Sequence, residues 1–352
     1  MFYTITEVSD HPCYEMQNIL KIFFEQTLQG ADWNLNKQHT IVSKIDGRSN
    51  FVDLLKTLHN ELTRRNDFVR QSINQQFVNN NNIESLCNNT LQIQDIIAWD
   101  ISIGKKIKEF FQDSYPKKLD LNIFKREGCD IQPTKRFYQD FIARNGHICP
   151  FCSILPHKNP FGNKRGDFDH YLDKDTYPMA ALNLDNLIPM CNECNQDYKH
   201  IANILKNEDD SRRIFIYPYS LDKPFRIEID SIVQDERIWK FNINIIADLD
   251  PIVVSNFDKV FKIKERIQRE IQKRYDAWLM QEIKRYTFEN GSVSINGFKA
   301  YLLNTAMNVL DLNNRTLETI LLEHSLYIYL GNTEINEINE IFLGSYLFEY
   351  IN

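Results

Sequence analysis

The sequence lacks long apolar runs, has little glycine or proline, and carries fewer basic residues (41 Lys and Arg) than acidic ones (48 Asp and Glu). No stretch approaches the roughly 18 consecutive apolar residues of a membrane-spanning helix, so we expect no membrane segment. The formal net charge is −7 with histidine neutral, which excludes a surface coated with basic groups for indiscriminate nucleic-acid binding. Because of this acidic balance, any contact with nucleic acid must use a local patch or a partner's surface. Glycine and proline number 11 each, and this low content says nothing about mechanism.

The length and the cysteines indicate the number of domains and the cellular compartment. A chain of 352 residues is long enough for two or three domains and a sizeable core. The N-terminus, MFYTITEVSDHPCYEM, lacks the basic start and apolar run of a secretory signal peptide. Four of the seven cysteines form two Cys-x-x-Cys pairs, which in such a chain indicates reduced thiols and one metal site. We therefore expect a cytoplasmic protein.

The first 145 residues show apolar residues at helical spacing. The run of asparagines at 79–82 predicts a loop. The last of the predicted helices begins at a proline and stops at Asn145-Gly146, a favourable helix end. The predicted helices are 14–28, 49–65, 94–111 and 133–145.

The rest of the chain divides into two further regions. Residues 146–213 hold cysteines, prolines and short apolar runs without helical period. After them, 225–230 and 239–245 alternate apolar and polar residues as strands do, and 257–286 has the pattern of one long amphipathic helix. The sequence therefore predicts a mainly helical α+β protein, with a helical N-terminal region (1–145), a small cysteine-framed module (146–213) and a C-terminal region with a β-hairpin and helices (214–352).

The two cysteine pairs frame the central module. Cys149 and Cys152 form one pair, and Cys191 and Cys194 form the other. Each pair can offer two thiolates to one tetrahedral ion, which is the geometry of a structural zinc site. Two independent thiol pairs, or iron in place of zinc, are the alternatives. Zinc held by four sulfurs has no position for water, so it would serve as a staple for a module too small to fold by apolar burial alone.

The segment inside this frame resembles the zinc-framed branch of the HNH endonuclease family, in which a ββα-metal motif lies between Cys-x-x-Cys pairs. The resemblance covers residues 147–200 and rests on the order and spacing of five elements. The wider layout resembles the HNH subunits of bacterial anti-phage systems such as Septu, which work with an ATPase partner. The five elements are CPFC, the DH pair at 169–170, NLIPMC with Asn186, CNECN ending in Asn195, and Lys199.

The resemblance assigns a role to each matching residue. Asp169 and Asn195 would hold a catalytic Mg²⁺ or Mn²⁺, and His170 would be the general base. Asn186 would orient the His170 imidazole, with Asn183 as the alternative for that task. The family often has histidine where Asn195 stands, and asparagine still offers an oxygen.

Three further residues are candidates for contact with the substrate. In the resembling family, a residue at the place of Lys199 meets a phosphate, and a solvated helix face is the alternative. His147 lies two residues before the first cysteine pair and is expected to face the surface or a phosphate. His200 follows Asn195 by five residues, off the metal-facing side, and is expected to be auxiliary.

The chemistry of phosphodiester cleavage agrees with these residue types. The reaction needs a water made nucleophilic near neutral pH and a cation that absorbs charge on the phosphate. Histidine, with an unperturbed pKa of about 6.5, can accept a proton there. A hard cation such as Mg²⁺ binds few protein oxygens and keeps places for phosphate and water.

These observations favour a metal-dependent nuclease, with DNA as the expected substrate and RNA, such as tRNA, as the alternative. A zinc-stapled nucleic-acid-binding or adaptor module without cleavage is the alternative from another class. An unrestrained nuclease would harm its host, so we expect a regulatory protein partner, with an ATPase as the leading candidate, and a role in phage defence. One site cuts one strand at a time, so an oligomer is an open alternative.

Overall fold

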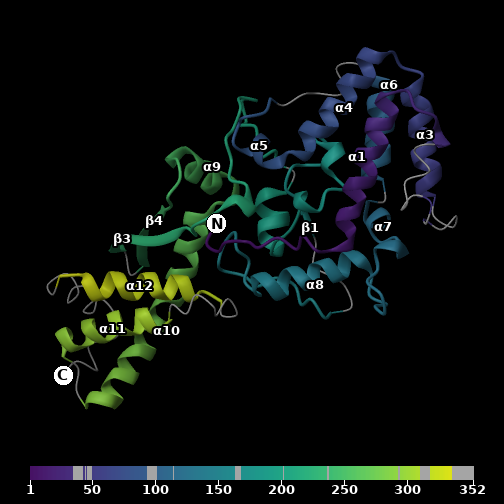
Figure 1. The fold of residues 1–352 in the computed structure, drawn as a ribbon. Coiled ribbons are helices and arrows are strands. Elements are labelled where there is room, and N and C mark those ends of the chain that lie inside the picture. Colours follow the sequence, from purple (N-terminus) through teal and green to yellow (C-terminus); the bar gives the residue numbers. More distant parts are fainter. Residues whose placement is uncertain are drawn as a thin grey trace. The chain divides into compact units, whose positions relative to one another are not determined.

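The computed structural model shows a mainly helical α+β protein (Figure 1). The residues that it describes form two small sheets. The chain divides into two compact units. The N-terminal unit comprises Ile5–Asn145 and His157–Leu221, and the C-terminal unit comprises Met1–Thr4, Gly146–Pro156 and Asp222–Asn352. The structure describes residues 1–34, 43, 45, 50–92, 101–113, 115–162, 168–200, 202–235, 238–291, 294–309 and 318–334.

The helices of the N-terminal unit follow the apolar periodicity of the sequence. Phe24 of the first helix stacks on Phe77 with ring centroids 4.5 Å apart and on Phe111 at 6.2 Å, so helices from three parts of the chain share one aromatic core. The predicted helices at 14–28, 49–65 and 133–145 are confirmed, and the described part of 94–111 is helical as well. The helices are α1 (Glu15–Leu28), α3 (Phe51–Thr63), α4 (Asp67–Asn81), α5 (Ile83–Cys87), α6 (Ile101–Gln112), α7 (Tyr115–Leu119) and α8 (Pro133–Asn145).

Two helix ends show how the local sequence acts. Gly146 follows α8 with φ of +83°, a backbone conformation that glycine adopts at no steric cost, so the predicted stop is confirmed. The prediction of a loop at 79–82 is wrong for its first part, because α4 continues to Asn81. Asn81 Nδ2 donates to the carbonyl of Phe77 at 2.8 Å and to that of Met179 at 3.2 Å. The first bond lies within α4 and the second is a tertiary contact, and together they support a weak helix former in helical conformation.

A small antiparallel pair of strands lies within the N-terminal unit. Strand β1 (Phe168–His170) pairs with β2 (Leu187–Pro189), with Asp169 opposite Ile188. Two short 3₁₀ turns, η5 (Pro178–Ala180) and η6 (Leu184–Asn186), lie on the loop that joins the strands. After β2 comes a short π-helical segment, η7 (Glu193–Lys199). The order strand, loop, strand, helix thus follows the chain from 168 to 199.

The C-terminal unit contains the predicted hairpin. Strands β3 (Arg226–Asp235) and β4 (Ile238–Ile246) are antiparallel, with a register shift between Ile229 and Ser231. The rings of Trp239 and Phe241 each lie 5.3 Å from the ring of Tyr275, so a helix covers this face of the hairpin. The helices of this unit are α9 (Pro251–Phe261), α10 (Ile263–Asn290), α11 (Ile295–Val309) and α12 (Ile320–Asn332).

The long helix predicted over 257–286 is two helices. Lys262 has a left-handed conformation, with φ of 51° and ψ of 42°, and separates α9 from α10. The side chain of Asp258 accepts the backbone N–H of Lys264 at 2.8 Å, which satisfies one of the N–H groups that the interruption frees. An apolar pattern alone does not reveal such a break, because the period resumes after it.

The two units cut across the three regions expected from the sequence. Most of the cysteine-framed module shares the N-terminal unit with the helices that precede it, whereas 146–156 belongs to the C-terminal unit. Among the helices that the structure describes, none combines the length and the apolar character that crossing a bilayer requires.

Candidate functional site

The first cysteine pair lies on a tight turn. The backbone N–H of Ser153 donates to the carbonyl of Cys149 at 2.9 Å, and the N–H of Cys149 donates to Leu155 at 3.0 Å. The N–H of Ile154 points at the sulfur of Cys152, 3.5 Å away. Such donors favour the thiolate form of a sulfur, which is the form that binds metal.

The second cysteine pair lies at the start of η7. The N–H of Asn195 donates to the carbonyl of Cys191 at 3.1 Å, the same bond across four residues that Ser153 makes to Cys149 in the first pair. Cys194 directly precedes Asn195 and is fully buried. Both pairs thus present two sulfurs from a turn closed by the same hydrogen bond.

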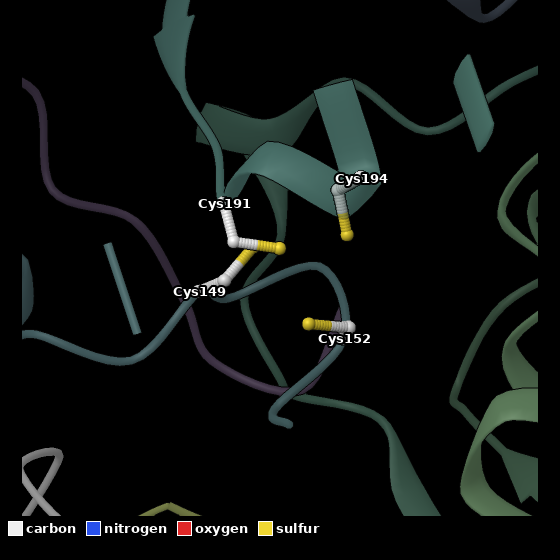
Figure 2. A group of neighbouring side chains, drawn as sticks. All are labelled: Cys149, Cys152, Cys191 and Cys194. Atoms are coloured by element: carbon white, nitrogen blue, oxygen red, sulfur yellow. The ribbon is translucent and has the colours of Figure 1, made fainter. Parts of the chain in front are cut away.

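The four sulfurs lie together (Figure 2). Cys149, Cys152, Cys191 and Cys194 are buried, and their sulfur atoms all lie within 4.8 Å of one another. Sulfurs about 2.3 Å from a central zinc ion, at the corners of a tetrahedron, are about 3.8 Å apart. All four thiols are free of disulfides. The cluster could therefore hold a structural metal such as zinc.

A separate cavity brings together three of the predicted catalytic residues. Its volume is about 300 Å³, and Asp169, His170 and Asn195 line it. Asn195 is only 6% exposed. The other lining residues are Tyr115, Phe168, Asp173, Lys174, Asp175, Gln196 and His200.

His170 is held in one tautomer. Its Nε2 lies 3.2 Å from the carbonyl oxygen of Ala181, and because a carbonyl only accepts, this nitrogen carries the proton in the neutral ring. The other nitrogen, Nδ1, is then an acceptor. The Tyr115 ring meets the imidazole edge-on, with centroids 4.5 Å apart. Burial lowers the pKa of His170 to about 4, against the opposing effect of the Ala181 carbonyl, so the ring is neutral at pH 7.

Asp169 is paired with Lys199 inside the protein. The Lys199 ammonium lies 3.1 Å from Oδ1 and 2.9 Å from Oδ2 of Asp169, and it donates to the carbonyl of His170 at 2.9 Å. The side chains are 4% and 1% exposed. Burial raises the pKa of the Asp169 carboxyl, and the Lys199 charge counteracts this shift. The phosphate contact predicted for Lys199 would require it to leave this pair.

Asn186 supports the loop after β1 and does not bond the His170 ring, contrary to the orienting role expected of it. Its Oδ1 accepts the N–H of Leu172 at 2.7 Å, and its Nδ2 donates to the carbonyls of Leu172 at 3.0 Å and Ala180 at 3.2 Å. The neighbouring Ala181 is the residue that bonds the imidazole. The polar atoms of the Asn186 side chain are thus used by the backbone of Leu172 and Ala180.

The remaining predicted residues lie further from the chemistry. Asn183, the alternative to Asn186, accepts the N–H of Asp185 at 3.0 Å and so caps the turn η6. His200 lines the cavity but is exposed, at a left-handed φ of 41°. His147 is exposed, belongs to the C-terminal unit, and is not among the described residues that line the cavity.

Two contributors escape sequence reasoning. Tyr115 comes from α7, far upstream of the module, and the Ala181 group is a backbone carbonyl. A tyrosine among 16 in the chain carries no positional signal, and every residue has a carbonyl. Only the basic and aromatic character of α7, with Lys117 and Lys118 beside Tyr115, could have drawn attention to this helix.

Comparisons with known proteins give one short match. "Protein ea31" of Escherichia phage lambda is 29% identical over 68 residues, which are 19% of this chain and 21% of that protein. The chain thus spans about a fifth of the length of this relative. No protein-family model matches. No solved structure matches.

Proposed function

We propose that this protein is a metal-dependent endonuclease of the HNH type, which hydrolyses phosphodiester bonds of nucleic acid. The observation that carries the proposal is the convergence of Asp169, His170 and Asn195 on one cavity of about 300 Å³. These side chains come from a strand and from the helical segment that follows its partner strand. A base and two oxygen donors around one space are what activation of water beside a phosphate requires.

His170 is the general base in this proposal. With Nε2 bonded to the carbonyl of Ala181, Nδ1 of the neutral ring can take a proton from water as the water attacks phosphorus. The low pKa keeps the ring neutral over the physiological range, so no pre-existing proton blocks this nitrogen. The Tyr115 ring against the imidazole limits its rotation, which preserves the orientation that proton transfer needs.

Asp169 and Asn195 would hold the catalytic Mg²⁺ or Mn²⁺. A carboxylate and an amide carbonyl are the hard oxygen donors that these cations prefer, and both residues line the cavity. The bound cation supplies charge stabilisation to the phosphate and its leaving oxygen. Lys199 already neutralises the Asp169 carboxylate, so the cation has a competitor within the protein.

The four cysteines serve the site indirectly. Zinc on the four thiolates would fix the start of η7, and through the bond from Asn195 to Cys191 it would fix the position of Asn195. With all four positions taken by sulfur, this ion would take no part in the hydrolysis.

Substrate and regulation follow from the resemblance to HNH nucleases. DNA is the expected substrate, with RNA, such as tRNA, as the alternative, and the biological role is phage defence in the cytoplasm. The net charge of −7 argues for a local contact or a partner's surface rather than a general basic coat. We infer a regulatory protein partner, with an ATPase as the leading candidate. Because one site cuts one strand at a time, cleavage of both strands would need an oligomer or two successive binding events.

A cleavage assay tests the proposal. The wild type, His170→Ala and His324→Ala are incubated with plasmid and with total RNA, each with Mg²⁺, Mn²⁺ or EDTA. His324 is the matched control, because its Nδ1 also lies near a carbonyl, that of Ala306 at 2.8 Å, but outside the cavity. We expect cation-dependent cleavage by the wild type and His324→Ala, and none by His170→Ala. Equal cleavage by all three would contradict the role of His170.

The buried pair of Asp169 and Lys199 favours a second candidate, a zinc-stapled module that binds nucleic acid or recruits other proteins without cleavage. Each charge in the pair has its counter-charge, as in a purely structural ion pair. Tight binding of nucleic acid with no cleavage under any cation would support this candidate and overturn the first.

A further inference from the structure

The environment of Lys199 is that of a cation in a site built to hold one. Its ammonium has three N–H donors, and three acceptors surround it, the two carboxylate oxygens of Asp169 and the carbonyl of His170, at 2.9 to 3.1 Å. The side chain is 1% exposed. The ammonium donates hydrogen bonds to Oδ1 and to the His170 carbonyl, whereas the buried Oδ2 is held by the ion pair and accepts no hydrogen bond from the described residues.

The backbone fixes this placement. Lys199 is the last residue of η7, whose first turn carries Cys194. The segment ends at His200, where the backbone turns to a positive φ and the His200 N–H donates to the carbonyl of Asn195 at 2.8 Å. The Lys199 side chain is therefore buried, whereas its neighbour His200 is exposed.

The pair is also the place where the divalent cation would bind. Asp169 lines the cavity, but both of its oxygens face the Lys199 ammonium. A divalent cation that used either oxygen would lie close to a like charge in a poorly solvated setting, where repulsion is strong. The cation must therefore displace the ammonium or bind against it.

We propose that Lys199 is a built-in competitor for the catalytic cation, so that the cation binds Asp169 only as the ammonium leaves it. This inference rests on the proposed function, because it takes Asp169 as a ligand of the cation. The wild-type chain then binds the cation weakly, and removal of the Lys199 charge strengthens binding. Displacement also frees an ammonium beside the cavity, which is where a substrate phosphate would lie.

Binding of Mn²⁺, followed by electron paramagnetic resonance of the free ion, tests the competition. The variants are wild type, Lys199→Gln, and Lys199→Gln combined with Asp169→Asn. We expect Lys199→Gln to bind Mn²⁺ at least tenfold more tightly than the wild type, and the double variant to lose this gain. Equal or weaker binding by a folded Lys199→Gln overturns the competition and leaves the nuclease proposal standing if the wild type cleaves. Absence of binding in every variant overturns the assignment of Asp169 itself.

A second measurement uses the wild type alone, so its result does not depend on whether Lys199→Gln folds. The wild type is treated briefly with acetic anhydride, with and without Mn²⁺, and acetylation is read by mass spectrometry. We expect acetylation of Lys199 to be slow without Mn²⁺ and to rise severalfold with it, whereas the exposed Lys273 reacts equally in both. Unchanged protection of Lys199 at saturating Mn²⁺ would contradict displacement.

Discussion

The backbone N–H of Asn195 donates a hydrogen bond to the carbonyl of Cys191 at 3.1 Å, so a residue of the cavity is tied directly to a residue of the cysteine cluster. The two sites share one short helical segment, η7. Whatever fixes the sulfurs therefore fixes one wall of the cavity. Loss of the cluster should impair the proposed reaction by displacing Asn195, although the cluster itself takes no part in the reaction.

The cluster gives the first prediction. The purified protein should carry about one zinc ion per chain, and Cys191→Ser should lose it, because the substitution removes one of the four thiolates. Since metal affinity contributes directly to the free energy of folding, the loss of zinc should also destabilise the protein. We expect a lower melting temperature and faster amide exchange over residues 191–199. Cys129→Ser, a half-exposed free thiol outside the cluster, is the control and should keep its zinc. Metal content and stability unchanged in Cys191→Ser would refute the assignment.

Asn186 gives a prediction about stability. Asn186→Ala removes three buried hydrogen bonds to Leu172 and Ala180 and should lower the free energy of unfolding by about 3 kcal/mol. Denaturant titration measures the change. The exposed Asn192, which makes no capping bond, is the matched control, and Asn192→Ala should cost less than about 0.5 kcal/mol. Similar changes in the free energy of unfolding for both variants would show that the hydrogen bonds of Asn186 do not stabilise the fold.

His11 predicts a pH dependence of stability. Burial, with a smaller effect of the Arg126 charge, lowers the pKa of His11 to about 4, whereas the unfolded chain has a pKa of about 6.5. Between these values the unfolded chain binds more protons, so stability falls as the pH falls from 6.5 to 4, by a total on the order of 3 kcal/mol. Above pH 6.5 this residue adds no pH dependence.

Urea titrations across this range measure the effect of His11. Its Nδ1 accepts the N–H of Cys13 at 3.3 Å, so His11→Asn keeps an acceptor and removes the titration. The difference between the two stability curves isolates this residue from the carboxyl groups. Parallel curves between pH 4 and 6.5 would show that His11 is not buried in neutral form.

Lys262 gives a prediction about the break between α9 and α10. Lys262→Gly places a residue without a side chain at φ of 51°, so we expect a change between zero and a gain of about 1 kcal/mol. Lys273→Gly, an exposed position inside α10, should instead lose about 1 kcal/mol. Thermal unfolding compares the two. An equal loss in both would mean that the helix is continuous through 262.

Much of the fold is predictable from local patterns. The apolar period of 14–28 predicts α1, and the alternation in 225–230 and 239–245 predicts the hairpin. The two thiol pairs predict the cysteine cluster, because two Cys-x-x-Cys turns in one module favour a shared metal. The left-handed Lys262 leaves no trace in the pattern, since the residue has no unusual propensity for that conformation.

The candidate site is predictable in its members and less so in their contacts. Asp169, His170 and Asn195 meet at one cavity as expected. Asn186 bonds the backbone and not the imidazole. The carbonyl of Ala181 makes the bond to the imidazole that was expected from Asn186. Which residue of this loop contacts the imidazole depends on the path of the loop, and the residue types alone do not predict that path.

The chain by itself determined which residues carry proton-accepting, oxygen-donating and thiol chemistry, and which stretches bury an apolar face, because both follow from composition and period within a few turns of backbone. Folding decided the rest: that Lys199 reaches the carboxylate of Asp169, and that Tyr115 packs on the ring of His170. These contacts join segments far apart along the chain, and their energy depends on burial, which exists only once the whole N-terminal unit has assembled.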